Sequence, residues 1–177
     1  MNLVSKYINK YYILNMSNTR RVMKEFKEIE DYINSEPSDN HRFLEIRTIK
    51  DNILNMEVTF MGPKESPYEE IISTINIQIP KEYPHRAPNM NFKNKIYHPN
   101  VGNGGNICLD ILKDQWRPIY TLRTTLMSII SLLNDPNPDS PLNGEAARGY
   151  KNGIKDKTAR RQYAKDILKN SVGNYNN

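Results

Sequence analysis

Three successive runs of alternating apolar and polar residues are the feature that most constrains how this chain folds. They lie at residues 44–48, 54–60 and 71–79, and Met90 with Phe92 marks a shorter fourth run. Because successive side chains of a strand point to opposite faces, each run describes a strand with one buried and one solvent-facing side. The pattern predicts a four-stranded antiparallel meander. In its first strand, the side chains expected to face inward are Leu44, Ile46 and Thr48.

The segment before the first strand has the pattern of an amphipathic helix. Its apolar residues recur at helical spacing over residues 19–34, and Glu-Pro-Ser at 36–38 is expected to end it. The inward-facing residues are Val22, Phe26, Ile29 and Ile33. Residues 1–17 precede this pattern and are interpreted as an N-terminal extension, so the folded domain is expected to span residues 18–170. Residues 171–177 are expected to form a frayed C-terminal tail.

The C-terminal third of the chain predicts three helices. Residues 122–133 are apolar on nearly all sides and follow Thr121, a capping residue, so they should form a central buried helix. A short helix is expected from a cap at Asn143 to about Tyr150, and a last helix over residues 156–169. One helix, a sheet and three further helices make an α+β fold.

Residues 93–120 show neither a helical nor a strand period. A long irregular segment inside a compact domain is usually functional or disordered. This one is too apolar to be free, so we expect an ordered loop that packs on the sheet. It carries the sequence His-Pro-Asn at 98–100 and, eight residues after that asparagine, the only cysteine, Cys108.

The single cysteine admits two interpretations from the residues alone. A lone thiol is often a small buried hydrophobe. Beside the polar donor Asn100 and the neighbouring glycines, it also suits a nucleophile whose intermediate is stabilised. One cysteine excludes an internal disulfide and a cysteine-based zinc cluster, and it fits a reducing compartment. No metal site is expected.

Composition excludes some classes of function. The formal charge is +5, from 25 basic and 20 acidic residues. This mixed balance fits ordinary solubility or a docking face for an acidic partner. A nucleic-acid-binding module has only the net charge in its favour, since no alternation of aromatic and basic residues is present.

The chain has no run of about 18 apolar residues that would span a membrane. Its N-terminus lacks a signal-peptide core, so a cytoplasmic or nuclear protein is expected.

Six separated motifs accompany this order of elements. They are MGPKESPY (61–68), YPHRAP (83–88), YHPN (97–100), NICLDIL (106–112), QWRP (115–118) and LLNDPNPDSPLN (132–143). Together they resemble the ubiquitin-conjugating enzyme family, over about residues 19–170. The resemblance implies the UBC-like fold: an N-terminal helix, a four-stranded antiparallel meander, an ordered active-site loop and three C-terminal helices. It also implies no bound cofactor, because ATP is used by the upstream activating enzyme.

The resemblance implies a chemistry for Cys108. Its thiolate would accept the C-terminal carboxyl of ubiquitin from an activating enzyme as a thioester and pass it to a substrate lysine. Asn100 would stabilise the oxyanion of the tetrahedral intermediate, or it would hold the loop in shape, and both interpretations stay open. His98 is implied to be structural, and Leu109 to lie beside the thioester.

Many members of the family place an acidic residue at the gate of this site, where the present chain has Ser140. Asp139, just before it, and Asp110 are then the nearby carboxylates in the sequence. The alternative is that both are solvated loop residues. A phosphate on Ser140 would restore the negative charge.

Partner surfaces are implied in the same way. Arg20, Arg21 and Lys24 match the helix face on which family members dock the activating enzyme and ligases, although a solvated helix face has the same pattern. His85 and Pro118 match the two loops that meet a ligase. Many HECT-compatible members carry phenylalanine where His85 stands, and apolar anchors of this kind dominate small interfaces. We therefore expect RING-type ligases, with HECT pairing disfavoured.

Two rival functions stay open. The chain could carry a ubiquitin-like modifier instead, because contacts with the activating enzyme select the modifier. It could also be a non-catalytic ubiquitin-binding scaffold, although such variants usually lack the cysteine that this chain has. For the conjugating enzyme, we expect a monomer without nucleic-acid or membrane partners.

Overall fold

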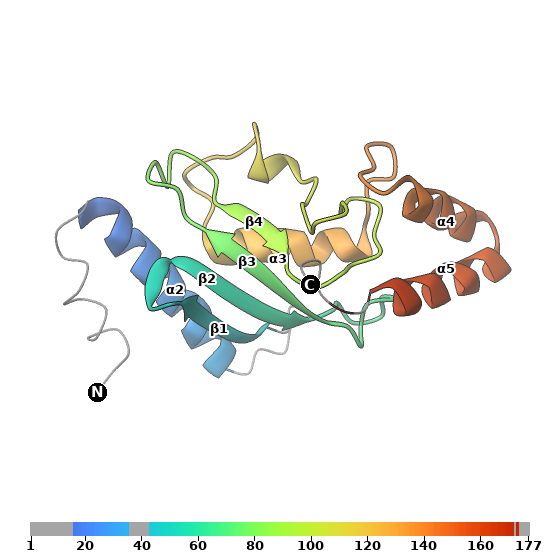
Figure 1. Cartoon of the computed structure of the whole chain (residues 1–177), viewed down its shortest axis with the longest axis horizontal. Coiled ribbons are helices and arrows are strands. Elements are labelled where there is room, and N and C mark those ends of the chain that lie inside the picture. Colours follow the sequence, from blue (N-terminus) through green and yellow to red (C-terminus); the bar gives the residue numbers. More distant parts are fainter. Residues whose placement is uncertain (1–15, 36–42, 172, 174–177) are drawn as a thin grey trace.

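The computed structural model describes residues 16–35, 43–171 and 173 of the 177-residue chain. Its helices are α2 (Met16–Asn34), α3 (Leu122–Asn134), α4 (Gly144–Lys155) and α5 (Lys157–Asn170), and its strands are β1 (Phe43–Ile49), β2 (Asn52–Met61), β3 (Ile72–Gln78) and β4 (Asn89–Phe92). A 3-10 helix, η1 (Asp110–Leu112), lies between β4 and α3 (Figure 1). This order confirms the predicted α+β fold. Residues 1–15 of the predicted extension and the predicted helix stop at 36–38 lie outside the described residues.

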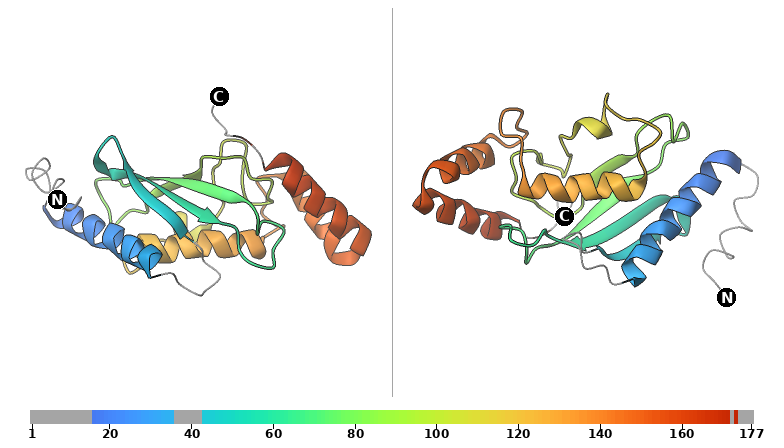
Figure 2. Two further views of the ribbon diagram at one scale, coloured as in Figure 1. Left: turned by 90° about the horizontal axis from the view of Figure 1, so that it is seen from below. Right: turned by 180° about the vertical axis from the view of Figure 1, so that it is seen from behind.

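The strands form one antiparallel sheet in the order β1-β2-β3-β4, which confirms the predicted meander. Val58 in β2 is opposite Ile46 on one side and Ile75 on the other. Phe92 of β4 is in turn opposite Ile75. Because side chains in register project to the same face, the apolar residues form a row across the sheet. α3 covers this face, and α2 packs against β1 and β2 (Figures 1 and 2).

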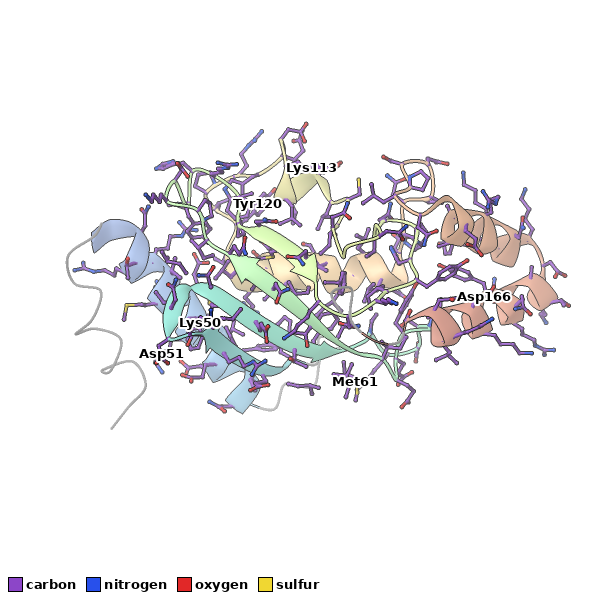
Figure 3. The ribbon with its side chains drawn as sticks, in the orientation of Figure 1. Lys50, Asp51, Met61, Lys113, Tyr120 and Asp166 are labelled. Atoms are coloured by element: carbon purple, nitrogen blue, oxygen red, sulfur yellow. The ribbon has the colours of Figure 1, made fainter. Side chains whose placement is uncertain are left out.

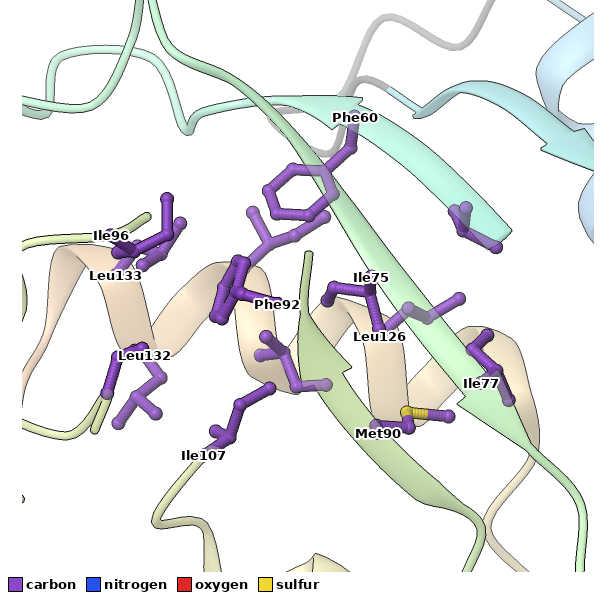
Figure 4. Close-up of a cluster of buried hydrophobic side chains, with 14 of the residues drawn as sticks. Phe60, Ile75, Ile77, Met90, Phe92, Ile96, Ile107, Leu126, Leu132 and Leu133 are labelled. Carbon is purple, nitrogen blue, oxygen red and sulfur yellow. The ribbon is translucent and has the colours of Figure 1, made fainter. Parts of the chain in front are cut away.

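The core lies between the sheet and α3. Figure 4 shows side chains of both layers meeting there, among them Ile75, Phe92 and Leu126. Residues with less than 2% exposure include Met56, Phe60, Ile75, Ile77, Phe92, Leu122, Leu126, Ile129 and Ile130. Thr121 caps α3 as predicted, because its side chain accepts the N–H of Thr124 in a capping box. Each fully buried Leu or Ile contributes about 1.5–3 kcal/mol, so α3 is a firm support for the segments at both of its ends.

The prediction that Leu44 faces inward is wrong. Its side chain is 44% exposed, whereas Phe43 is 5% exposed. The register of β1 slips here, because the two positions from Phe43 to Glu45 correspond to a single step along β2. An extra residue of this kind forms a bulge, which shifts the alternation by one position and turns Leu44 outward.

Two ion pairs of Glu57 lie on the polar side of β2. Glu57 is only 6% exposed, and its carboxylate accepts hydrogen bonds from Arg47 Nε at 3.0 Å and from Lys93 Nζ at 2.7 Å. Burial acts to raise the pKa of Glu57, but the hydrogen bonds and charges of Lys93 and Arg47 outweigh it and lower that pKa. An ionised Glu57 therefore ties β1, β2 and the end of β4 together.

α4 is longer than predicted and ends at Lys155, well beyond Tyr150. α4 and α5 pack as a hairpin at one end of the molecule (Figure 1). Gly153 makes this close packing feasible, since a Cβ there would lie 3.1 Å from the Cα of Arg160. The predicted cap at Asn143 is present, because its side chain accepts a backbone N–H of the first turn of α4. The side chain of Asp156 caps α5 in the same way.

The start of the predicted C-terminal tail is docked and not frayed. Ser171 is 8% exposed, and its Oγ accepts the N–H of Tyr97 at 2.9 Å. The carbonyl of Gly173 accepts the N–H of Lys95 at 2.7 Å. These contacts satisfy two backbone donors of the irregular segment, which explains why the chain stays attached there. Residues 172 and 174–177 lie outside the described residues.

Candidate active site

The irregular segment after β4 folds back on itself and brings Cys108 beside Asn100. The N–H of Cys108 donates to the carbonyl of Asn100 at 2.9 Å, and Val101 pairs with Ile107 in an isolated bridge. Gly105 permits this turn: its φ is 80°, and a Cβ there would lie 2.0 Å from a backbone oxygen of β4. The predicted ordered loop is therefore present, and its backbone positions the thiol.

His98 is fully buried and has both ring nitrogens occupied. Nδ1 accepts the N–H of Asn100 at 3.0 Å, so the other nitrogen, Nε2, carries the proton and donates to the carbonyl of Leu132 at 2.9 Å. Burial lowers the pKa of His98 to about 4, against the raising effect of the Leu132 hydrogen bond. The imidazole is therefore neutral at pH 7 and joins the loop to α3, as expected of a structural histidine.

The side chain of Asn100 is also buried, at 1% exposure, and holds a second loop. Its Nδ2 donates to the carbonyls of Asn137 at 2.7 Å and Ser140 at 3.3 Å, and its Oδ1 accepts the N–H of Asn137 at 2.8 Å. In this arrangement both amide hydrogens are engaged by backbone oxygens. The geometry therefore favours loop support, and donation to an oxyanion requires release of the longer bond.

The residues at the predicted gate have different surroundings. Ser140 contributes its carbonyl to Asn100, while its own side chain is on the exposed surface. Asp139 is exposed and pairs with Lys151 of α4 at 2.9 Å. Asp110 opens η1 with an exposed side chain. Neither carboxylate is hydrogen-bonded to Cys108 among the described contacts.

The thiol of Cys108 is half-buried, and a residue that was not predicted lies next to it. Lys113 Nζ is 3.3 Å from Cys108 Sγ. Lys113 follows η1 directly and its side chain is exposed (Figure 3). Leu109, between them in sequence, is the residue before η1 and packs against the core. Cys108 and Lys113 lie on either side of η1. Neither a helical nor a strand period pairs residues five positions apart, so no signal in the sequence marks this contact.

The predicted docking residues of α2 do not behave alike. Arg20 and Lys24 are exposed. The guanidinium of Arg21 instead pairs with Glu25 at 2.6 Å and donates to the carbonyl of Pro118 at 2.6 Å. The main role of Arg21 is therefore inside the molecule, where it joins α2 to the loop before α3.

Glu25 is a structural residue that the sequence interpretation missed. It is 4% exposed, and its Oε2 accepts the hydroxyl of Tyr83 at 2.6 Å and the N–H of Leu122 at 2.8 Å. A signal was present, because Glu25 is three residues after Val22 and four before Ile29 and so lies on the apolar face of the helix. A carboxylate on that face needs buried donors, and the structure supplies them.

The two predicted ligase loops lie beside each other, and the first of them lines an open groove. The indole of Trp116 donates to the carbonyl of Pro84 at 2.7 Å, which holds the loop of His85 beside the loop of Pro118. His85, Trp116 and Lys113 all line this groove. The groove is thus lined both by the loop of His85 and by the segment that carries the thiol.

In residues 16–35, 43–171 and 173, no group of three or more His, Cys, Asp or Glu side chains is placed to hold a metal ion. No described helix has the length and hydropathy that crossing a membrane requires.

A protein-family model described as ubiquitin-conjugating enzyme matches residues 21–166. The chain belongs to the ubiquitin-conjugating enzyme family. A curated relative, "Ubiquitin-conjugating enzyme E2 1" of Schizosaccharomyces pombe, is 42% identical over 133 residues, which are 75% of this chain and 58% of the relative. The present chain therefore spans less than two thirds of that family member.

Solved structures of the same family confirm the fold. H. polymorpha ubiquitin-conjugating enzyme Pex4p, crystallised with the soluble domain of Pex22p, matches with a TM-score of 0.78 and 27% identity, over 89% of this chain and all of that chain. The E2 domain of a Toxoplasma gondii ubiquitin-conjugating enzyme matches with a TM-score of 0.69 and 32% identity, over 84% of this chain and 92% of that chain. The predicted family fold is thus present across most of the described residues.

Proposed function

We propose that this protein is a ubiquitin-conjugating enzyme that accepts ubiquitin from an activating enzyme as a thioester on Cys108 and transfers it to a substrate lysine. The observation that carries the proposal is the position of the thiol. Cys108 is half-buried at the surface, on a loop held by backbone hydrogen bonds to the buried turn at 98–100. A merely structural cysteine would be expected inside the core.

The loop supports transfer between thiols without a catalytic base. The incoming acyl group is already a thioester, so the thiolate of Cys108 displaces another thiolate at little cost. The imidazole of His98 has no free nitrogen and is buried away from solvent, so it cannot take a proton from Cys108. We assign it to holding the loop.

The second step, attack of an amine on the thioester, produces an oxyanion. Asn100 is a polar donor that the framework holds close to Cys108, since its backbone carbonyl accepts the N–H of Cys108. In the proposal its amide releases the 3.3 Å contact to Ser140 and turns to the oxyanion, or else it acts only by holding the gate loop. Asp139 or Asp110 would receive the incoming ammonium in place of the acid that is absent at Ser140.

The exposed residues at the predicted docking positions define the partner surfaces of the proposal. Arg20 and Lys24 present free charge on α2 for the activating enzyme, while His85 and Pro118 form the pair of loops offered to a ligase. His85 supplies no large apolar anchor, so we propose a RING-type ligase and disfavour a HECT partner. The proposal includes a monomer in the cytoplasm or nucleus, without a bound cofactor.

One assay tests the proposal against its rivals. The protein is incubated with activating enzyme, ATP and one purified modifier at a time, and the products are run on non-reducing and reducing gels. A thiol-sensitive band with ubiquitin, absent in Cys108→Ala, supports the proposal. A band only with a ubiquitin-like modifier would support the first rival. Binding of ubiquitin without any band would support the scaffold.

A further inference from the structure

The net positive charge of this chain is concentrated in its C-terminal helical hairpin. Residues 144–170, which form α4 and α5, contain eight basic and three acidic residues. The whole chain has 25 basic and 20 acidic residues, so the remainder has 17 of each and is formally neutral. All eight basic side chains of the hairpin are exposed. The charge of +5 is therefore a property of one end of the molecule (Figure 1).

Four of these basic residues form a stripe along the outer side of α5. They follow one another at spacings of four residues, which places them on the same side of a helix. The opposite side of α5 carries Tyr163 and Ile167, which are buried in the core. We call the four residues the basic stripe: Lys157, Arg161, Lys165 and Lys169.

The basic stripe does not stabilise the helix that carries it. Like charges four residues apart repel each other, so each neighbouring pair in the stripe lowers helix stability. Among the described residues, no carboxylate forms an ion pair with the stripe: Asp166 accepts from the amide of Gln162, and Asp156 caps the helix. A row of exposed charge without an internal partner suits an external partner of opposite sign.

Both ends of the hairpin are attached to the turn beside the thiol. The N–H of Asn143, which caps α4, donates to the carbonyl of Pro99 at 3.0 Å. At the end of α5, Ser171 Oγ accepts the N–H of Tyr97 at 2.9 Å. The hairpin is therefore fixed to the frame that positions the thiol, and a molecule bound to α5 is held near that frame.

We propose that the basic stripe docks an acidic segment of a protein substrate and so presents a lysine of that substrate to Cys108. Docking needs only the stripe, whereas delivery to the thiol rests on the proposed function. At 1.5 Å per residue, the stripe from Lys157 to Lys169 is about 18 Å long, which an extended acidic tract of about six residues spans.

The surroundings of the stripe favour an acidic protein segment over a membrane or a nucleic acid. Leu168 is the exposed large apolar residue of α5, whereas binding in a lipid surface requires a wide apolar face. The aromatic residue of α5, Tyr163, is buried on the other side, so the stripe offers no ring on which a base can stack. Carboxylates of a protein segment require neither feature.

Binding is tested with two fluorescent peptides that differ only in charge. Each contains one lysine and, after a flexible spacer of varied length, a tract of glutamate in one peptide and of glutamine in the other. The stripe variant changes all four stripe residues to glutamine: Lys157→Gln, Arg161→Gln, Lys165→Gln and Lys169→Gln. By fluorescence anisotropy, it should bind the glutamate peptide at least about tenfold more weakly than wild type. Its melting temperature should be equal or higher, because the like-charge pairs are removed.

A matched control removes the same amount of charge elsewhere. It changes four exposed residues outside the hairpin to glutamine, Lys50, Lys64, Lys81 and Arg86, so its net charge equals that of the stripe variant. At physiological salt, distant charges are screened, and the control should bind the glutamate peptide within about twofold of wild type.

Delivery is tested with enzyme loaded with ubiquitin. Wild type should transfer ubiquitin to the glutamate peptide with a KM at least about tenfold below that for the glutamine peptide, and the stripe variant should lose this preference. Loading and discharge to free lysine should be the same in both proteins, because neither step uses the stripe.

The inference is wrong if wild type does not prefer the glutamate peptide, or if the stripe variant retains that binding. It is equally wrong if the matched control loses as much binding as the stripe variant. Tighter stripe-dependent binding of duplex DNA, or of vesicles that contain phosphatidylserine, would show that the occupant is not an acidic protein segment. Absence of a thioester in every variant would overturn the proposed function and delivery, while peptide binding would still decide whether the stripe docks an acidic segment.

Discussion

The turn at residues 98–100 and the segment at 108–113 are hydrogen-bonded neighbours, yet they differ in burial and in bonding. The polar side chains of the turn, His98 and Asn100, are 0% and 1% exposed and are bonded to backbone groups of distant segments. Cys108 is half-buried and faces an exposed lysine. The difference teaches that the two parts of the candidate site are built differently: the turn forms a rigid frame, and the thiol lies at its rim, where a protein-sized partner can reach it.

Cys108→Ala is expected to have the largest effect on loading with ubiquitin and almost none on stability. Loading with ubiquitin should be lost completely, because the thiol is the proposed point of attachment. The melting temperature should change by less than about 2 °C, since truncation of a half-exposed side chain usually alters stability by under about 0.5 kcal/mol. Non-reducing gels and thermal melts measure the two effects. A residual thiol-sensitive band would contradict this assignment.

His98→Ala should show the opposite behaviour. It leaves a cavity and removes the partners of two buried backbone groups, the Asn100 N–H and the Leu132 carbonyl, so we expect a loss of about 4 kcal/mol in the free energy of unfolding. Urea denaturation measures it. His85→Ala, at an exposed histidine, is the control and should change stability by under about 0.5 kcal/mol. Equal effects of the two substitutions would mean that the turn is not a frame.

Stability should also depend on pH through His98. Its pKa is about 4 in the folded protein, below the ordinary value of 6.5. Between pH 4 and 6.5, His98 is therefore protonated in the unfolded chain and neutral in the folded chain. At about 1.4 kcal/mol per pH unit, lowering the pH from 6.5 to 4 should cost about 3 kcal/mol, and no cost arises above 6.5.

Urea titrations at several pH values test this dependence, with His98→Gln expected to lose the slope between pH 5 and 6.5. Glu57 acts in a different window, because its lowered pKa gives stability that is lost only as pH falls below its ordinary value of 4.5. A slope that is unchanged in His98→Gln would show that another group titrates in this range.

Asn100→Ala should reveal whether this residue belongs to the frame alone. Loss of its bonds to the gate loop is expected to cost about 2 kcal/mol of stability, while loading on Cys108 is retained. Discharge to free lysine should be slower. If discharge slows about 100-fold while the free energy of unfolding does not change, the amide acts on the oxyanion and loop support is the wrong assignment.

The smallest effect is expected at the gate. Ser140→Asp places a carboxylate on an exposed position of the loop that Asn100 holds, and it should speed discharge to lysine about two- to threefold at low salt through attraction of the ammonium. Ser140→Asn is the neutral control of similar size. A rate that is the same for both variants at every pH would exclude an electrostatic role for this position.

Local patterns were sufficient for most of the fold. Alternation placed Val58, Phe60 and Ile75 in the core, and the caps at Thr121 and Asn143 began helices where expected, because side-chain direction and orphan N–H groups are local properties. The position of Leu44 was wrong for a non-local reason. A bulge in β1 depends on how that strand registers against β2, which no window of the sequence contains.

The sequence by itself determined the family motifs, the meander and the central helix, and it singled out Cys108 as the only cysteine, because each depends on residues close together in the chain. Only the tertiary structure decided what the polar side chains bind. It showed Asn100 hydrogen-bonded to Asn137, Glu25 hydrogen-bonded to Tyr83, and Lys113 in contact with Cys108. These contacts join segments that come together only when the chain packs, and packing removes the competing water from the buried ones. The partners of a polar side chain are therefore a property of the folded chain.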